Sequence, residues 1–220
     1  MLWDGVQVTL LVGVCAMALA LVMGLLGAWG KLSHSRTART AADTYTTVIR
    51  GVPELILILI VYYGTPTLIQ TVLESFGHDI IIDINPFLAG FITIGFIYGA
   101  FATEVFRGAF LAIDKGQIEA ARAYGMSRSL AFRRILLPQV WRFALPGLGN
   151  VWMVLIKATA LISVIQLPEL LRNADIAARA VRLPFTFYFA ASLIYLAITI
   201  VSMLALQRAE AWANRGIRRA

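Results

Sequence analysis

Residues 5–30 read GVQVTLLVGVCAMALALVMGLLGAWG and contain no charged side chain. A transmembrane helix needs about 20 mostly apolar residues, so this stretch is long enough to cross a bilayer. No basic residue precedes it, and its apolar run is longer than that of a cleavable signal peptide. We therefore expect it to remain in the mature protein as the first membrane span.

The rest of the chain has the same character. Of its 220 residues, 60% are hydrophobic and 14% are charged, whereas soluble domains have about 45–50% and about 25%. This composition argues against a soluble enzyme, a disordered chain or a nucleic-acid partner. A single cysteine, Cys15, and two separated histidines, His34 and His78, give neither a disulfide framework nor a zinc ligand set.

Hydropathy predicts an all-α membrane protein with five transmembrane helices in a single domain, residues 1–220. Four further windows resemble the first in length and apolar content, with Asn85-Pro86 as a cap and first helical position for the third. The five expected spans are residues 5–30, 52–72, 85–106, 143–165 and 184–206.

Basic residues in the loops between the expected spans, 31–50 among them, predict the orientation. Fifteen of the nineteen Lys and Arg residues lie in segments 31–50, 107–142 and 207–220, which share one side of a five-span chain. The positive-inside rule places that side in the cytoplasm, so the N-terminus is expected outside and the C-terminus inside. Segment 166–183 departs from the rule, because it carries three arginines on the expected outer side.

Small residues recur every four positions in two spans, which predicts close helix packing. The first span has Ala16, Ala20, Gly24 and Ala28, and the third has Gly95 and Gly99. We expect a helix–helix contact in preference to a pore lining. The second span is interrupted at Gly64-Thr65-Pro66, which suits either a substrate route or a structural kink.

Segment 107–142 is too long and too basic for a simple connector and predicts two short helices. The first begins near Asp114 and ends at Gly125, which permits a left-handed turn. Ser127 is placed to cap the second helix, which Pro138 is expected to end before the fourth span. A short surface helix with alanines suits insertion into a groove of a partner protein.

The spacing in this segment resembles the EAA motif of ABC importer permeases. The matching residues are Glu119, Ala120, Ala121, Gly125, Ile135, Leu137 and Pro138. The resemblance implies a type I ABC importer permease fold in which 107–142 is the cytoplasmic coupling-helix segment. It also implies that these seven residues contact or support a cytoplasmic ABC ATPase dimer.

Residues 45–55, 96–109 and 143–161 extend the resemblance to permeases for polar amino acids, nearest the Q-type subunits for histidine, lysine, arginine, ornithine, octopine or nopaline. This implies a multi-pass subunit of the bacterial inner membrane, surrounded by lipid. The implied partners are a non-identical M-type permease, a periplasmic amino-acid-binding protein and an amino-acid substrate. ATP–Mg is expected in the ATPase, and no cofactor in this chain.

Individual polar positions leave alternatives open. Glu119 either docks on the ATPase or supports its own helix through the macrodipole. Lys157 and Asn150 are seven residues apart and are expected on one face of the fourth span. Lys157 either binds a substrate carboxylate or forms a structural contact with an acidic residue or a helix C-terminus, called the pin below, and we favour the pin.

We expect a substrate path lined by Asn150 and Lys157 together with Glu54, Thr159 and Ser163. Glu104 and Arg107 are three residues apart and are predicted to pair with each other.

Gly30-Lys31 is followed by leucine and lacks the phosphate-loop spacing, so we expect no ATP binding by this chain. A stand-alone channel or secondary transporter is the alternative function, although no inverted repeat is evident. A membrane-embedded enzyme would need a cluster of carboxylates or histidines within the bilayer, and the sequence has none.

Overall fold

The computed structural model describes residues 1–78 and 82–214, which excludes Arg215, Arg218 and Arg219 of the basic tail. The described residues form helices connected by short turns. The α-helices are α1 Leu2–Leu32, α2 Arg36–Gly51, α3 Glu54–Leu59, α4 Thr65–Ser75, α5 Pro86–Leu111, α6 Lys115–Ala123, α7 Arg128–Ala131, α8 Leu137–Ala158, α9 Leu170–Val181 and α10 Pro184–Ala213. Two π-helical turns, Ile60–Gly64 and Phe132–Leu136, and a 3₁₀ segment, Thr159–Ile165, complete the list.

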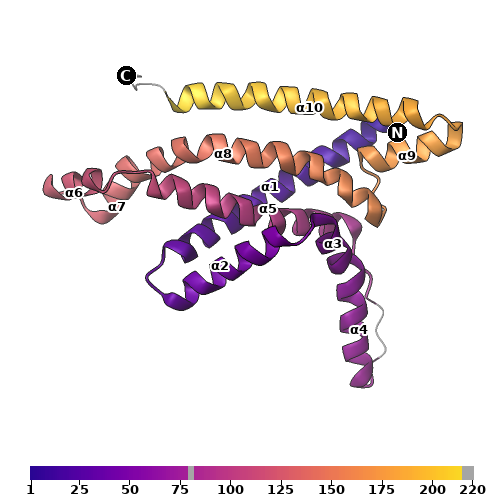
Figure 1. The fold of residues 1–220 in the computed structure, drawn as a ribbon, viewed down its shortest axis with the longest axis horizontal. Helices are drawn as coiled ribbons and strands as arrows, with labels where there is room; N and C mark the ends of the chain where they lie inside the picture. Colours follow the sequence, from indigo (N-terminus) through magenta and orange to yellow (C-terminus); the bar gives the residue numbers. More distant parts are fainter. Residues whose placement is uncertain (79–81, 215–220) are drawn as a thin grey trace.

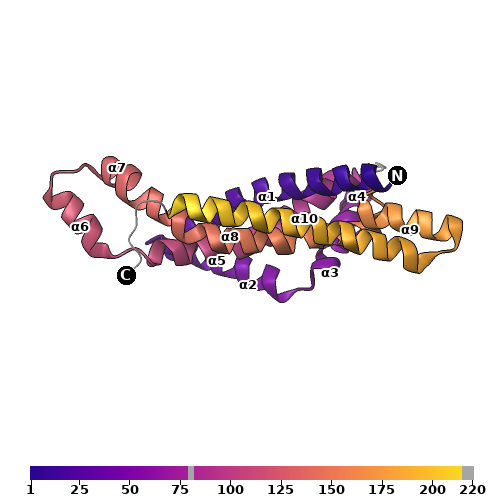
Figure 2. The ribbon, with the colours of Figure 1, turned by 90° about the horizontal axis from the view of Figure 1, so that it is seen from above.

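The five predicted spans are confirmed within the described residues, each with shifted ends. Helices long and apolar enough to cross a membrane cover Leu2–Leu32, Glu54–Ser75, Pro86–Leu111, Arg128–Ile165 and Pro184–Ala213. The N-terminus and α9 lie at one end of the molecule, and α6 and α7 lie at the other (Figures 1 and 2).

The treatment of segment 31–50 as a loop is wrong. Its residues form α2, whose N-cap Ser35 accepts a hydrogen bond from the backbone N–H of Ala38. The helix is strongly amphipathic and packs against α1 and α5. Because polar residues cover much of its surface, its average hydropathy is low and a search for apolar windows misses it.

The ridges of small residues lie in the most extensive helix contact of the described residues, which is between α1 and α5. A Cβ atom added at Gly24 would lie 2.6 Å from the Cβ of Ala102, and one at Gly95 would lie 2.8 Å from the Cβ of Leu19. Larger side chains at these glycines would separate the two backbones. The expected role of the ridges in helix packing is therefore confirmed.

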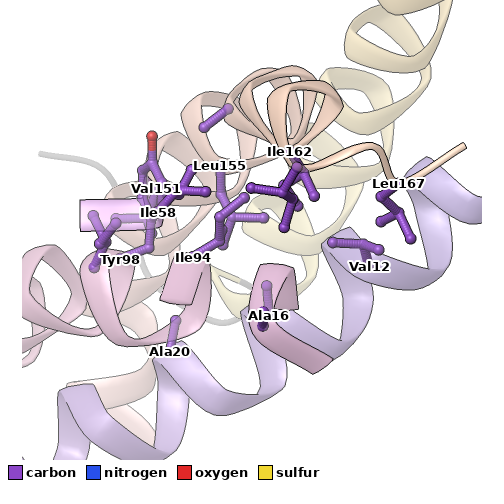
Figure 3. Close-up of a cluster of buried hydrophobic side chains, with 14 residues drawn as sticks. Val12, Ala16, Ala20, Ile58, Ile94, Tyr98, Val151, Leu155, Ile162 and Leu167 are labelled. Atoms are coloured by element: carbon purple, nitrogen blue, oxygen red, sulfur yellow. The ribbon is translucent and has the colours of Figure 1, made fainter. Parts of the chain in front are cut away.

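An apolar cluster lies at the centre of the bundle. Figure 3 shows side chains from α1, α3, α5, α8 and the 3₁₀ segment meeting there, among them Val12, Ile58, Tyr98, Leu155 and Ile162. In contrast, α10 lies outside this cluster and packs against α8 and α9. Its window is only 6% buried, so this chain leaves most of α10 uncovered.

The interruption predicted in the second span is a π-helical turn. Helix α3 passes through Ile60–Gly64 into α4, with Pro66 in the first turn of α4. Pro66 has no N–H, and a change in the hydrogen-bond ladder just before it accommodates that loss. Beyond this turn α4 leaves the bundle at a steep angle to α10 (Figure 1).

The expectation that Pro138 ends the helix after Ser127 is wrong. Helix α7, the π-helical turn Phe132–Leu136 and α8 follow one another without a break, and Pro138 lies in the first turn of α8. Proline is tolerated in a first turn because its missing N–H is not required there. The surface helix is thus continuous with the fourth span.

Candidate functional site

The short helix α6 is positioned by its two ends. Its N-cap Asp114 accepts a hydrogen bond of 2.7 Å from the N–H of Gly116. At the other end, Gly125 has φ +77°, and the N–H of Met126 donates to the carbonyl of Ala121. This is a Schellman turn, which favours glycine at the left-handed position. Both predicted ends of the helix are confirmed.

The two alanines of α6 point in different directions. Ala120 and Glu119 are exposed, whereas Ala121 is 3% exposed and packs inward. The motif residues are expected to contact or support the ATPase, and Ala121 fits only a supporting role, because its side chain is covered by this chain. Tyr124, which the sequence analysis assigned no role, is 87% exposed beside the glycine turn. An aromatic residue at the end of a polar helix was the signal that could have identified it.

Helix α6 packs against α7 and the π-helical turn Phe132–Leu136, and a side-chain hydrogen bond joins it to the base of α8. The side-chain amide of Gln139 donates to Gln117 Oε1 over 2.6 Å. A cleft of about 300 Å³ lies between α6 and the π-helical turn, bordered by Ile118, Glu119 and Leu136. A rigid displacement of α6 would therefore be transmitted to the fourth span.

The remaining motif positions lie where α7 runs into α8. Ser127 caps α7 by accepting a hydrogen bond from the N–H of Leu130. Ile135 is half-buried in the π-helical turn, and Leu137 and Pro138 are exposed. The seven motif residues thus form one continuous structural unit, with Glu119, Ala120, Leu137 and Pro138 on its surface.

The predicted pair of Glu104 and Arg107 is confirmed, with a separation of 3.0 Å. The structure adds Lys31, whose Nζ lies 2.5 Å from Glu104 and 3.0 Å from Asp43. The Lys31 side chain is only 10% exposed. The group joins α1, α2 and α5 near the end of the bundle that carries α6, and sequence reasoning missed it because its members are far apart in the chain.

Glu54 is directed toward α5 rather than toward the polar residues of α8. Its Oε1 accepts a hydrogen bond of 2.9 Å from the buried Tyr98 hydroxyl. The Tyr98 ring stacks on Phe101, and the guanidinium of Arg50 lies 5.1 Å from the centre of the Phe101 ring. Arg50 and Glu54 therefore flank a pair of aromatic rings at the start of the second span.

Asn150 and Lys157 are both exposed on α8, in agreement with the predicted common face. Within residues 1–78 and 82–214, Lys157 makes no ion pair, so the acidic pin is absent there. Thr159 is fully buried, and its hydroxyl donates to the carbonyl of Ile156. Ser163 borders a separate pocket of about 290 Å³ with Asp175 and Arg179. The five expected path residues do not form one site in this chain.

A fully buried carboxylate lies near the end of the bundle that carries α9, and sequence reasoning did not find it. Glu169 caps α9 by accepting hydrogen bonds from the N–H groups of Leu171 and Arg172. The Tyr195 hydroxyl donates to Glu169 Oε2 over 3.1 Å and ties α10 to this end of the bundle. Burial raises the pKa of the Glu169 carboxyl above its ordinary value, and these hydrogen bonds oppose the shift.

Comparison with protein families gives one match that covers most of the chain. The family model described as binding-protein-dependent transport system inner membrane component matches residues 17–218. The matched region includes α6, the π-helical turns and four complete predicted spans.

Individual relatives match over nearly the full length. The chain is 45% identical over 217 residues to the histidine/lysine/arginine/ornithine transport system permease protein HisQ of Escherichia coli (strain K12), covering 99% of this chain and 95% of the relative. It is 47% identical over 211 residues to the octopine transport system permease protein OccQ of Rhizobium meliloti, covering 96% and 89%.

Among solved structures, a crystal structure of an amino acid ABC transporter with histidines superposes with a TM-score of 0.81. The sequence identity is 32%, and the match covers 96% of this chain and 92% of the other. The resemblance found in the EAA spacing and the five-span fold agree with these comparisons.

Proposed function

Because the chain belongs to the family of binding-protein-dependent transport system inner membrane components, we propose that it moves basic or opine-type amino acids inward. The chain is a permease subunit of an ABC importer of the inner membrane, and its relatives are named as transport proteins rather than enzymes. We further propose a cytoplasmic ATPase dimer that binds ATP–Mg, an M-type permease and a periplasmic amino-acid-binding protein as its partners.

The observation that carries the proposal is the connection of α6 to α8, through the Gly125 turn and then through α7 and the π-helical turn, which run into α8 without a break. The exposed Glu119, Ala120 and Tyr124 present a surface for the ATPase at one end of the molecule. The hydrogen bond between Gln117 and Gln139 fixes α6 to α8. Closure of an ATPase dimer on this surface would move α6 and α8 together, and so alter the exposed face that carries Asn150 and Lys157.

A bulky charge on the surface of α6 tests this coupling. Ala120→Arg should reduce ATP-driven uptake and co-purification of the ATPase, because the added guanidinium occupies the space that the partner needs. Ala41→Arg is the matched control, since Ala41 is an exposed alanine on α2. Equal uptake by the two variants, in vesicles that contain the complete importer, would refute the assignment of α6 as the docking helix.

The exposed face of α8 is the proposed part of the substrate route. A free lysine in the membrane is costly unless it meets water, a ligand or a partner subunit. Lys157→Ala should abolish uptake while the subunits still co-purify at normal stoichiometry. Loss of the assembled complex would instead support a pin formed with a residue of the second permease subunit.

A substrate panel tests the proposed class with the same vesicles. Arginine, lysine, histidine, ornithine and octopine are compared with glutamate and leucine, each with the binding protein added outside. We expect stimulation by the basic amino acids or octopine only, and stimulation by glutamate or leucine alone would refute this class. Uptake that continues without ATP would favour the alternative of a channel or secondary transporter.

A further inference from the structure

An apolar groove runs along α10 on the outside of the bundle. One stretch, of about 480 Å³, lies between α8 and α10 and is bordered by Leu145, Leu148, Trp152, Ala205 and Ala209. A second stretch, of about 400 Å³, lies between α1 and α10 and is bordered by Leu10, Ile194 and Ile198. Val201 and Ser202 border both stretches, so the two are adjacent, and together they are called the groove.

The larger stretch of the groove has about the depth of one membrane leaflet. From Ile194 to Ala209 the groove follows sixteen residues of α10, whose fifteen rises of 1.5 Å amount to about 22 Å. The stretch from Val201 to Ala209 covers about 12 Å, close to the roughly 15 Å of one leaflet in a hydrocarbon core of about 30 Å. The larger stretch therefore matches the depth of a single leaflet, on the side of α6 and α7.

The walls of the groove favour hydrocarbon over water or a polar ligand. None of the side chains that border either stretch in the described residues is charged. The indole N–H of Trp152 donates to the hydroxyl of Ser202 over 2.9 Å, so these two polar groups satisfy each other. A ligand in the groove would find few hydrogen-bonding groups available, which suits a saturated chain.

Basic and aromatic side chains stand at the end of the groove near α6. Arg208 and Trp212 follow Ala205 by three and seven residues, so they lie on the same face of α10. Arg142 adjoins Trp141, which borders the groove, and its Nε donates to Asn214 over 2.8 Å. Tryptophan and arginine at this level are typical of the interface where phospholipid headgroups lie.

We propose that the groove between α8 and α10 binds one acyl chain of an anionic phospholipid, whose phosphate lies beside Arg208 and Arg142. The positive charge of Arg208 and Arg142 at the end of the groove near α6 favours an anionic headgroup, and the apolar side chains along Val201–Ala209 contact the acyl chain. The lipid covers the face of α10 that the protein leaves open and fills the space between α10 and the core. The proposal concerns this chain in the membrane and does not depend on the transported substrate.

Native mass spectrometry of the assembled importer tests the proposal. The complex is delipidated in detergent and titrated with phosphatidylglycerol or with phosphatidylcholine of identical acyl chains. We expect phosphatidylglycerol to be retained in preference to phosphatidylcholine. Arg208→Gln should weaken retention about fivefold, since one arginine near a lipid surface contributes about 1 kcal/mol. Arg36→Gln, which changes an exposed arginine of α2, should leave retention unchanged.

A second variant tests the acyl chain separately. Ala205→Phe places a ring in the groove and should abolish retention, whereas Ala211→Phe adds the same ring to another face of α10 and should not. Equal retention of the two lipids, or normal retention by Ala205→Phe, would overturn the proposal. So would a complex that retains no lipid, because the second permease subunit would then cover the groove.

Discussion

Replacement of Gly24 by alanine probes the contact on which the bundle depends. The added Cβ would lie 2.6 Å from the Cβ of Ala102 and 3.0 Å from its carbonyl carbon, so two helix backbones must move apart. Overpacking of this kind costs about 1–3 kcal/mol. Alanine regains about 1 kcal/mol over glycine in a helix. We therefore expect a net loss of about 1 kcal/mol in the free energy of unfolding.

Gly108→Ala is the matched control, because a Cβ added at Gly108 of α5 has no neighbour within 4 Å among the described residues. It should gain about 1 kcal/mol from helix propensity alone. The two variants should differ by about 4–8 °C in melting temperature when purified in detergent. Addition of Ala102→Gly to the Gly24 variant should recover part of the loss. If Gly24→Ala melts at or above Gly108→Ala, the α1–α5 contact is not as close as described.

Three further changes test separate parts of the structure. Glu104→Gln leaves the nearly buried Lys31 with one remaining partner and should cost about 2 kcal/mol of stability, part of which Lys31→Met should restore. A double-mutant cycle on unfolding in detergent measures the coupling between the two residues, and additive effects of the two changes would contradict the ion pair. Because burial raises the pKa of Glu169, the folded state holds the proton of this carboxyl more tightly than the unfolded state does. Stability should therefore fall as the pH rises above the ordinary pKa of 4.5 and through the raised pKa. The melting temperature of Glu169→Gln should depend less on pH than that of the unchanged protein, and an equal dependence would exclude this group. Gly125→Ala places a side chain at φ +77°, at a cost of roughly 1–2 kcal/mol to the turn, and should lower ATP-driven uptake without loss of the protein from the membrane, whereas Gly51→Ala should have no effect on uptake.

Features encoded by neighbouring residues were predictable. The ends of α6 follow from Asp114 and Gly125, because a cap and a left-handed turn need only the local backbone. The start of α5 at Asn85-Pro86 is confirmed for the same reason, since Asn85 accepts hydrogen bonds from the N–H groups of Phe87 and Leu88. The interruption before Pro66 was also predictable, although its form as a π-helical turn was not.

Errors arose where a local signal depends on its surroundings. Pro138 was expected to end a helix, but the preceding π-helical turn places it in a first turn, where proline is tolerated. The charges of 31–50 suggested a loop, yet packing against α1 and α5 stabilises α2. Ala121 is buried although its neighbour Ala120 is exposed, and the difference arises where α6 packs against α7 and the π-helical turn.

The sequence alone determined the membrane class, the five spans and the ends of the short helix in segment 107–142, because hydropathy and caps act within one stretch of chain. Only the tertiary structure decided which charges meet. Lys31 and Glu104 are 73 residues apart, and Tyr195 reaches Glu169 from another helix. Such pairs form because burial in an apolar bundle makes an isolated charge or hydroxyl costly, and that cost depends on the neighbours that folding supplies.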